Sequence, residues 1–363
     1  SRVAEGESFP MEFVGRSREL AELHAIWREA EKGRTKVGLI TGPSGIGKTR
    51  LAHELTSYVS KDEIRAVSVR GVRAEMRLRW GTVSDFVRQL LRLPGSAGIS
   101  SASDSLLRAM LPSLGRDEIS LQTVNGVSPA AILDAIADLL ESVSYEAPLV
   151  ALVDDFQWLD QESRSLFVGL ANRCRELRVL FLFLGRADLS SRHWEEVESA
   201  LMSEAGATRF LLKPLIEEEI GELLALGAAF PDPEEAAAVV RKNFEASSGN
   251  PLFIREILKE LHEQGILQRE ESGWVFQTSK VPEEFELPEN IRHLLRERLD
   301  RLTEPAASLA AILARENRGC STETLQRETQ LPSAVFTQAV AELLERGVIE
   351  WVDGNRLEFM HDL

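Results

Sequence analysis

The chain has 363 residues, of which 44% are hydrophobic and 28% are charged, and its net charge is −16. This length exceeds one compact core and predicts roughly two or three domains. The acidic balance disfavours a surface built to neutralise many nucleic-acid phosphates. Cys174 and Cys320 lack metal-ligand spacing and are typical of thiols in a reducing compartment. The longest apolar runs, such as 179–184, are far shorter than the ~20 residues of a membrane helix. With no signal peptide visible, we expect a cytoplasmic protein.

The first part of the chain alternates between expected strands and expected helices. The strands are expected at 37–40, 64–69, 149–153, 179–184 and 209–212. The helices are expected at about 17–33, 50–58, 106–111, 129–143 and 163–174, with one more that holds Phe86, Leu90 and Leu91. Such alternation predicts a parallel sheet that helices cover on both faces. We therefore expect residues 1–213 to form an α/β domain.

Helices predominate beyond Pro214. They are expected at 217–226, 233–246 and 251–264, before a hairpin of 266–268 with 274–276. A third segment has expected helices at 290–302, 305–315, 321–329 and 332–346 and a closing hairpin of 348–351 with 357–360. The last three helices and this hairpin make a winged-helix pattern. The expected division is 1–213, a helical domain at 214–287 and a winged-helix domain at 288–363.

The strongest motif is Gly42-Pro43-Ser44-Gly45-Ile46-Gly47-Lys48-Thr49, which matches the phosphate-binding loop pattern at every fixed position. An apolar strand before it and an amphipathic helix after it supply the required context. The glycines let backbone N–H groups surround phosphates, and the helix N-terminus favours their charge. Lys48 would reach the β- and γ-phosphates, and the Thr49 hydroxyl would ligate Mg²⁺. We include Arg50, the next residue, among the nucleotide-binding residues.

Charged residues also follow the two buried strands downstream. Asp154 and Asp155 end the strand at 149–153, and we assign Asp154 to Mg²⁺ and Asp155 to orienting the attacking water. Either could instead be a helix cap or a strand-end turn, but the upstream loop favours the catalytic role. Arg186 follows the strand at 179–184, either as a solvated arginine or as a sensor of the γ-phosphate.

Three further features have ordinary structural explanations when each is taken alone. Asn250 and Pro251 are typical of a helix N-cap and first helical position. His361 could be a polar residue at a strand end, and Val14 and Arg16 could belong to a loop that enters a helix.

Taken together in chain order, these motifs resemble the STAND signal-transducing ATPases, a branch of the AAA+ superfamily. The resemblance rests on Phe13-Val14-Gly15-Arg16-Ser17-Arg18-Glu19-Leu20, the phosphate-binding loop, Leu152-Val153-Asp154-Asp155-Phe156-Gln157-Trp158-Leu159-Asp160, Gly185-Arg186, Gly249-Asn250-Pro251-Leu252-Phe253 and Phe359-Met360-His361-Asp362. It covers essentially the whole chain and is closest to the ATPase modules of large LuxR-type regulators and of related cyclase- and kinase-linked proteins. It implies a P-loop NTPase domain, a helical lid and a winged-helix domain.

The resemblance also implies roles for individual residues. Val14, Arg16 and Pro251 would border the adenine, and Arg186 would be the first sensor. His361 would contact the β-phosphate of ADP and hold a closed state. Asp155 stands where many AAA+ enzymes have glutamate, so slow hydrolysis is expected. Arg173 and Arg175 are positional candidates for an arginine finger.

Two functional hypotheses follow. The first is an ATP/ADP-dependent switch in signalling or transcriptional regulation that self-associates when ATP is bound. Its sensor and effector domains are expected to lie outside this chain. The second is a DNA-binding initiator or activator ATPase. Residues 332–346, the candidate recognition helix, disfavour this second hypothesis. A surface that contacts DNA phosphates should be basic, but this helix has Glu342 and Glu345 and a single basic residue, Arg346. A metabolic kinase fits less well, since no acceptor pocket is evident and the additional domains would be unexplained.

Overall fold

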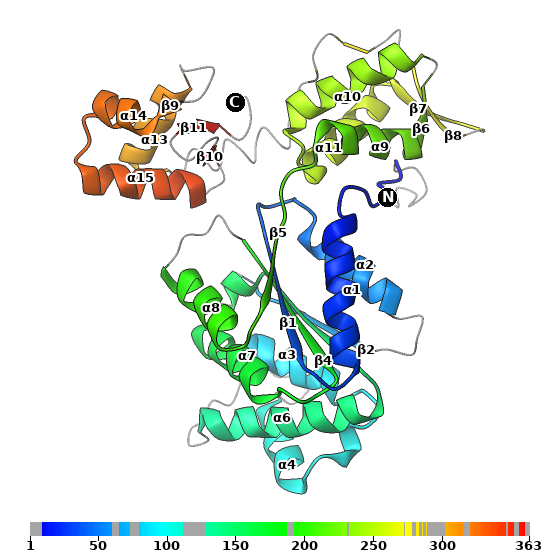
Figure 1. Cartoon of the computed structure of the whole chain (residues 1–363), viewed down its shortest axis with the longest axis vertical. Coiled ribbons are helices and arrows are strands. Elements are labelled where there is room, and N and C mark those ends of the chain that lie inside the picture. Colours follow the sequence, from blue (N-terminus) through cyan, green and yellow to red (C-terminus); the bar gives the residue numbers. More distant parts are fainter. Residues whose placement is uncertain are drawn as a thin grey trace.

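The structure is a computed structural model that describes residues 9–59, 65–72, 80–111, 128–186, 192–230, 232–271, 273–277, 281–282, 285, 288, 302–314, 320–345, 348–351 and 356–359. Figure 1 shows a sheet flanked by helices in the lower part of the view, a helical group at the upper right and a smaller group at the upper left.

A five-stranded parallel sheet forms the centre of the lower group. Its strands are β1 (Lys36–Thr41), β2 (Arg65–Arg70), β3 (Leu149–Asp154), β4 (Val179–Gly185) and β5 (Thr208–Leu211), in the order β2-β3-β4-β1-β5. Each pairing is parallel, so the carboxyl ends of the strands share one edge. Strands β3 and β4 are buried along their whole length, as the apolar runs predicted. The predicted parallel sheet is confirmed.

Helices cover both faces of this sheet. On one face, α1 (Ser17–Glu31) and α2 (Lys48–Val59) pack against apolar side chains of β1, β3, β4 and β5. The opposite face carries α3 (Gly81–Leu90), α4 (Ser101–Met110), α6 (Pro129–Glu146), α7 (Gln161–Arg173) and α8 (Arg192–Ser203). Because β3 lies between these two hydrophobic cores, its carboxyl end is held rigidly beside the end of β4.

Local sequence explains where several of these helices begin. The Ser128 hydroxyl accepts a hydrogen bond from the Ala131 N–H, and Pro129 fills the first position of α6. The Asp160 carboxylate accepts from the Ser163 N–H at the start of α7. Such caps satisfy N–H groups that have no partner within the helix.

The helical group at the upper right has its own hydrophobic core. It contains α9 (Glu217–Gly227), β6 (Ala228–Ala229), α10 (Pro233–Ser247), α11 (Pro251–Glu263), β7 (Leu267–Glu270) and β8 (Gly273–Phe276). The expected hairpin is present, with Leu267 opposite Phe276 in the antiparallel pair β7–β8. Strand β6 adds to β8 in parallel, a two-residue pairing too short for the sequence pattern to indicate.

The remaining group combines α13 (Glu304–Leu313), β9 (Cys320–Ser321), α14 (Thr322–Thr329), α15 (Ser333–Glu345), β10 (Ile349–Trp351) and β11 (Arg356–Phe359). The expected antiparallel pair is formed by β10 and β11, and β9 joins β11 as a third strand. Most of the helix expected at 290–302 lies outside the described residues. So does His361, which therefore stays a prediction.

Two expectations in the lower group need correction. The helix expected at 106–111 is α4, which begins five residues earlier because the Ser100 hydroxyl accepts from the Ser103 N–H. Helix α8 was not predicted at all. Apolar residues at Trp194, Val197 and Leu201 recur at helical spacing there, and that signal could have revealed it.

Both cysteines are buried, and none of the helices in the described ranges is long and apolar enough to span a bilayer. Burial raises the pKa of the Cys174 thiol to about 12. Because the thiolate is the reactive form, we expect Cys174 of the folded chain to resist iodoacetamide at pH 8. Mass spectrometry should find it labelled only after denaturation, and rapid labelling of the native chain would contradict this burial.

Candidate functional site

The phosphate-binding loop lies at the carboxyl edge of the sheet, between the end of β1 at Thr41 and the start of α2 at Lys48. Gly45 and Gly47 adopt φ angles of 82° and 99°, which residues with a Cβ rarely adopt. The Lys48 ammonium donates hydrogen bonds to the carbonyl oxygens of Gly42 at 2.8 Å and Pro43 at 2.7 Å. Lys48 is thus folded back over the loop that precedes it.

Asp154, at the end of β3, lies beside the first turn of α2. The Thr49 hydroxyl donates to Asp154 Oδ2 at 2.8 Å, and the Asp155 N–H donates to Asp154 Oδ1 at the same distance. A hydroxyl and a carboxylate are the hard oxygen ligands that Mg²⁺ takes beside phosphates and water. This donor pair therefore fits Mg²⁺. Within the described ranges, no group of three or more His, Cys, Asp or Glu could form an all-protein metal site.

Asp155 is held by two side chains that the sequence analysis did not assign to the site. Its Oδ2 accepts from Arg70 at the end of β2, at 2.8 Å from Nε and 2.7 Å from Nη2. Its Oδ1 accepts from Gln157 Nε2 at 2.9 Å. The hydrogen bond to Asp155 raises the pKa of the Arg70 guanidinium above its usual value. Both carboxylate oxygens of Asp155 therefore have partners.

The register of the β2–β3 pair explains why Arg70 lies beside the acidic residues. Arg70 lies opposite Asp154 in this pair, so its side chain starts next to the two acidic residues. The following residue, Gly71, permits the close approach, because a Cβ there would lie 2.5 Å from the Asp155 carbonyl oxygen. The sequence analysis missed Arg70 because the strand expected at 64–69 ended one residue before it. In addition, the sequence does not show which strands are neighbours in the sheet.

Ser44 of the loop is contacted from two directions. Arg186, after β4, donates from Nη2 to the Ser44 hydroxyl at 3.3 Å. Asn250 donates from Nδ2 to the Ser44 carbonyl oxygen at 3.0 Å and accepts the Leu252 N–H at its Oδ1. The expected N-cap of α11 is present, whereas the contact between Asn250 and the loop was not predicted.

Arg16 is buried at the start of α1 and reaches the connection between β5 and α9. Its guanidinium donates to the Lys213 carbonyl oxygen and lies 3.8 Å from the Glu19 carboxylate. Burial lowers the pKa of Arg16 from its usual value, while Glu19 and Glu219 act in the opposite direction. Arg16 therefore braces the connection that leads to the helical group.

A cavity of about 390 Å³ brings most of the predicted residues together. The predicted residues that line it are Val14, Arg16, Ser44, Gly45, Ile46, Gly47, Lys48, Thr49, Arg50, Asp154, Asp155, Arg186 and Pro251. Gly42 and Pro43 instead supply the carbonyls that hold Lys48. The lining residues that the sequence analysis missed are Met11, Glu12, Phe13, Arg70, Leu215, Leu223, Leu252 and Arg255.

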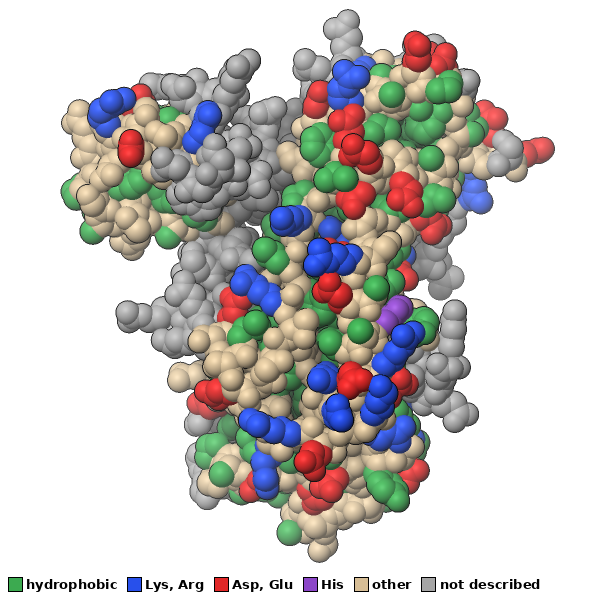
Figure 2. All heavy atoms as spheres, in the orientation of Figure 1, with side chains coloured by type: hydrophobic (Ala, Val, Ile, Leu, Met, Phe, Trp, Pro, Cys, Tyr) green, Lys and Arg blue, Asp and Glu red, His purple; other side chains and the backbone are tan. Residues whose placement is uncertain are grey.

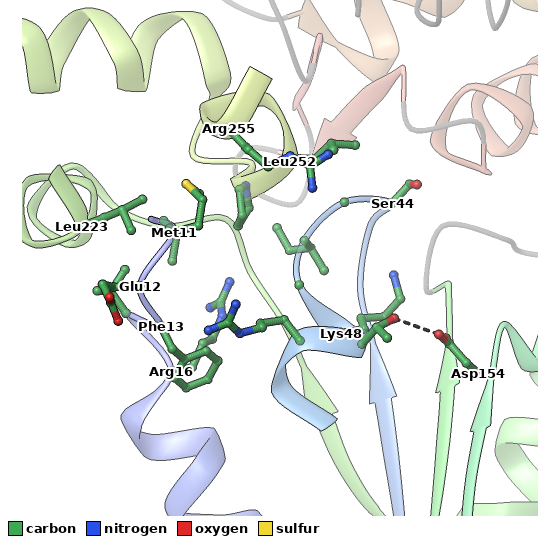
Figure 3. A pocket seen from close by; sticks show the side chains of 18 of the residues that line it. Met11, Glu12, Phe13, Arg16, Ser44, Lys48, Asp154, Leu223, Leu252 and Arg255 are labelled. Atoms are coloured by element: carbon green, nitrogen blue, oxygen red, sulfur yellow. Dashed lines mark hydrogen bonds between the residues drawn. The ribbon is translucent and has the colours of Figure 1, made fainter. Parts of the chain in front are cut away.

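The cavity has two chemically different ends, which Figure 3 shows side by side. Met11 and Leu223 are the apolar residues at one end, where the acidic Glu12 lies near them, and Lys48 and Asp154 mark a polar end. Six of the lining residues are Lys or Arg and three are acidic. In a chain of net charge −16, this local positive excess favours an anionic ligand.

Arg173 and Arg175 lie at the other edge of the sheet. The Thr35 N–H, just before β1, donates to the Arg175 carbonyl oxygen at 3.0 Å. Arg173 Nε lies 3.4 Å from the Asp134 carboxylate. The structure therefore does not bring this pair to the cavity of its own chain, and the finger stays a prediction.

The parallel sheet and its loop define a P-loop NTPase fold. Residues 12–182 match the family described as "AAA ATPase domain". This part of the chain, which contains the loop and both aspartates, is thus similar to AAA ATPase domains.

Solved structures support the same fold. A Walker-type ATPase of Pyrococcus abyssi is 13% identical with a TM-score of 0.56, over 96% of this chain and 94% of that one. The Aeropyrum pernix ORC2 protein, solved as ADPNP-ADP complexes, is 15% identical with a TM-score of 0.55, over 98% and 92%. At these identities the likeness concerns the fold alone.

A curated relative, an uncharacterized protein of Rhizobium meliloti, is 27% identical over 266 residues. The match covers 67% of this chain and 24% of the relative, so the chain spans about a quarter of that protein's length.

Proposed function

We propose that the chain binds ATP and ADP with Mg²⁺, hydrolyses ATP slowly and acts as a nucleotide-dependent switch. The observation that carries this proposal is a cavity on a phosphate-binding loop whose lining combines apolar side chains with six Lys or Arg residues and three acidic ones. Nucleotide sites are typically apolar clefts of a few hundred Å³ with few, well-placed polar groups. The apolar side chains suit a purine base, and the Lys and Arg side chains suit a row of phosphates.

The polar residues of the cavity would have different roles around the phosphates. Lys48 and the loop N–H groups would bind the phosphate oxygens, for which Lys48 would exchange its contacts to Gly42 and Pro43. Thr49 and Asp154 would hold Mg²⁺, which neutralises phosphate charge when bound. Arg186 already donates a hydrogen bond to the Ser44 hydroxyl of the loop. We expect it to contact the γ-phosphate when ATP is bound and to lose that contact after hydrolysis.

The contacts of Asp155 support slow hydrolysis. A residue that orients water must offer it a lone pair of a carboxylate oxygen. In this arrangement Arg70 donates twice to Oδ2 of Asp155, and Gln157 donates once to Oδ1. Because each carboxylate oxygen has two lone pairs, these contacts leave one lone pair of Oδ1 for water.

A switch requires that the ligand distinguish two arrangements of the protein. The cavity wall includes Leu223 of α9 and Leu252 of α11 together with the phosphate-binding loop of the lower group. A nucleotide bound there contacts both groups of elements at once and favours the arrangement that keeps them together. We propose that the helical group is a lid, that the C-terminal group is a winged-helix domain, and that ATP permits self-association.

The His361→Ala variant is expected to release ADP faster and to form more oligomers. The reason is that His361 would supply a contact to ADP in the closed state alone, and a ligand shifts an equilibrium only by such differential contacts. Displacement of a fluorescent ADP and light scattering after size exclusion measure the two effects. If the variant retains ADP and stays monomeric like the parent, His361 does not hold the closed state.

Direct DNA binding is not part of this proposal. Helix α15 contains no Lys or Arg, and its Glu342 accepts hydrogen bonds from the N–H and hydroxyl of Thr303. Figure 2 shows many acidic side chains over the helical group. The first turns of α9 and α10 are acidic as well, with Glu217, Glu218 and Glu219 in α9 and Glu234 and Glu235 in α10. A salt-dependent mobility shift of plain duplex DNA by the chain would reverse this conclusion.

The direct test of nucleotide binding is to identify what co-purifies with the chain and whether it exchanges. We expect adenine nucleotide, displaced by added ATP with Mg²⁺. If no nucleotide is retained and calorimetric titration detects no binding of ATP or ADP, the proposed function is wrong.

A further inference from the structure

The Asn250 side chain joins two groups of elements that are far apart in sequence. It belongs to the N-cap of α11 and is 4% exposed. Its Nδ2 donates to the Ser44 carbonyl oxygen in the phosphate-binding loop at 3.0 Å, and its Oδ1 accepts the Leu252 N–H at 3.0 Å. The two partners fix the amide orientation, since a carbonyl needs a donor and an N–H needs an acceptor.

The surroundings of this contact leave little free space. A Cβ on Gly45 would lie 2.7 Å from Leu252 Cβ and 2.9 Å from Asn250 Oδ1. On the other side, the Leu215 N–H donates to the Gly249 carbonyl oxygen at 2.8 Å. Gly249 has a φ of 72°, and a Cβ there would lie 2.0 Å from the Leu215 carbonyl oxygen. The turn before α11 is therefore held between the loop and the chain segment that leads to α9.

We propose that Asn250 is a positioning residue that couples the phosphate-binding loop to the helical group and thereby slows nucleotide release. The proposal rests on the proposed function, because it concerns nucleotide bound in the same cavity. Moving α11 away from the loop breaks the hydrogen bond from Asn250 to Ser44. That move would also separate Leu252 and Pro251 from the loop wall of the cavity. The hydrogen bond from Asn250 to Ser44 therefore opposes opening of the site even when no nucleotide is bound.

The two functions of Asn250 can be separated by substitution, because each uses a different atom. Its oxygen caps α11, and its NH₂ group reaches the loop. Serine and aspartate are also good N-caps, but neither carries an amide donor. Asn250→Ser is neutral and shorter, whereas Asn250→Asp keeps the size and adds a charge. An effect that both variants share is therefore due to the lost donor.

The experiment measures release of a fluorescent ADP from the full chain by stopped flow after excess unlabelled ADP is added. Losing one buried hydrogen bond predicts release on the order of tenfold faster in both variants. Their thermal unfolding midpoints should fall by no more than that of the control below, because the cap is kept and one hydrogen bond is lost. As a matched control, Asp232→Ala removes the cap of α10, where Asp232 accepts the Glu234 N–H. That control should lower the unfolding midpoint and leave the release rate unchanged.

Hydrogen exchange supplies a readout that a merely structural role would not change. In the parent, ADP should protect both the loop and residues 251–263. In Asn250→Ser, ADP should still protect the loop but should protect 251–263 less. Parent-like release and protection in both variants would refute the coupling while leaving nucleotide binding intact. Absence of ADP binding by the parent would instead refute the proposed function.

Discussion

Lys48→Ala is expected to weaken ATP binding about 100-fold, because charge-assisted hydrogen bonds contribute roughly 1.5–3 kcal/mol each. The Lys48 side chain is buried at the loop, 9% exposed, and its ammonium lies on the loop carbonyls of Gly42 and Pro43. In the proposed complex it exchanges these neutral acceptors for anionic phosphate oxygens. Isothermal titration calorimetry with ATP and Mg²⁺ measures the change.

The matched control is Lys32→Ala. Lys32 follows α1, is exposed and pairs with Glu29 at 2.7 Å. Exposed ion pairs contribute little, so this variant should bind ATP like the parent and unfold at nearly the same temperature. If both lysine variants bound ATP as tightly as the parent, the loop would not be the phosphate site.

The elements that the sequence predicted well depend on local patterns. The loop, its strand and its helix are contiguous, and their glycine spacing and apolar periodicity arise within about 20 residues. The apolar runs of β3 and β4 indicate burial on both faces, and so they place Asp154 and Arg186 at one edge of a parallel sheet. These local patterns predicted Lys48, Thr49, Asp154, Asp155 and Arg186 of the cavity lining, although not Arg70.

The parts that the sequence did not predict are contacts between distant segments. Arg70 becomes a partner of Asp155 only through the pairing of β2 with β3, 85 residues apart. Asn250 reaches Ser44 across 206 residues, and Leu223 closes the apolar end from a different helix. No periodicity encodes such contacts, because they depend on how separately formed elements pack. The short pairings of β6 and β9 were missed for the same reason.

Asp155→Asn should reduce the rate of ATP hydrolysis at least about 100-fold, the usual scale for loss of a general base, while ATP affinity changes only a few-fold. The amide keeps the size of the side chain but cannot take a proton from water. The Asp155 carboxylate bonds to Arg70 and Gln157, so the proposed phosphate and Mg²⁺ ligands should remain in place. Single-turnover hydrolysis and equilibrium titration separate the two effects.

Arg70→Ala is the companion variant that decides whether the contact to Asp155 restrains hydrolysis. The Arg70 side chain is largely exposed, and its removal frees one carboxylate oxygen of Asp155 while leaving Gln157 on the other. If the ion pair holds Asp155 away from water, hydrolysis by Arg70→Ala should equal or exceed that of the parent. A loss as large as that of Asp155→Asn would mean that Arg70 itself is needed for hydrolysis. In that case the slow rate would have to arise from the short reach of Asp155 alone.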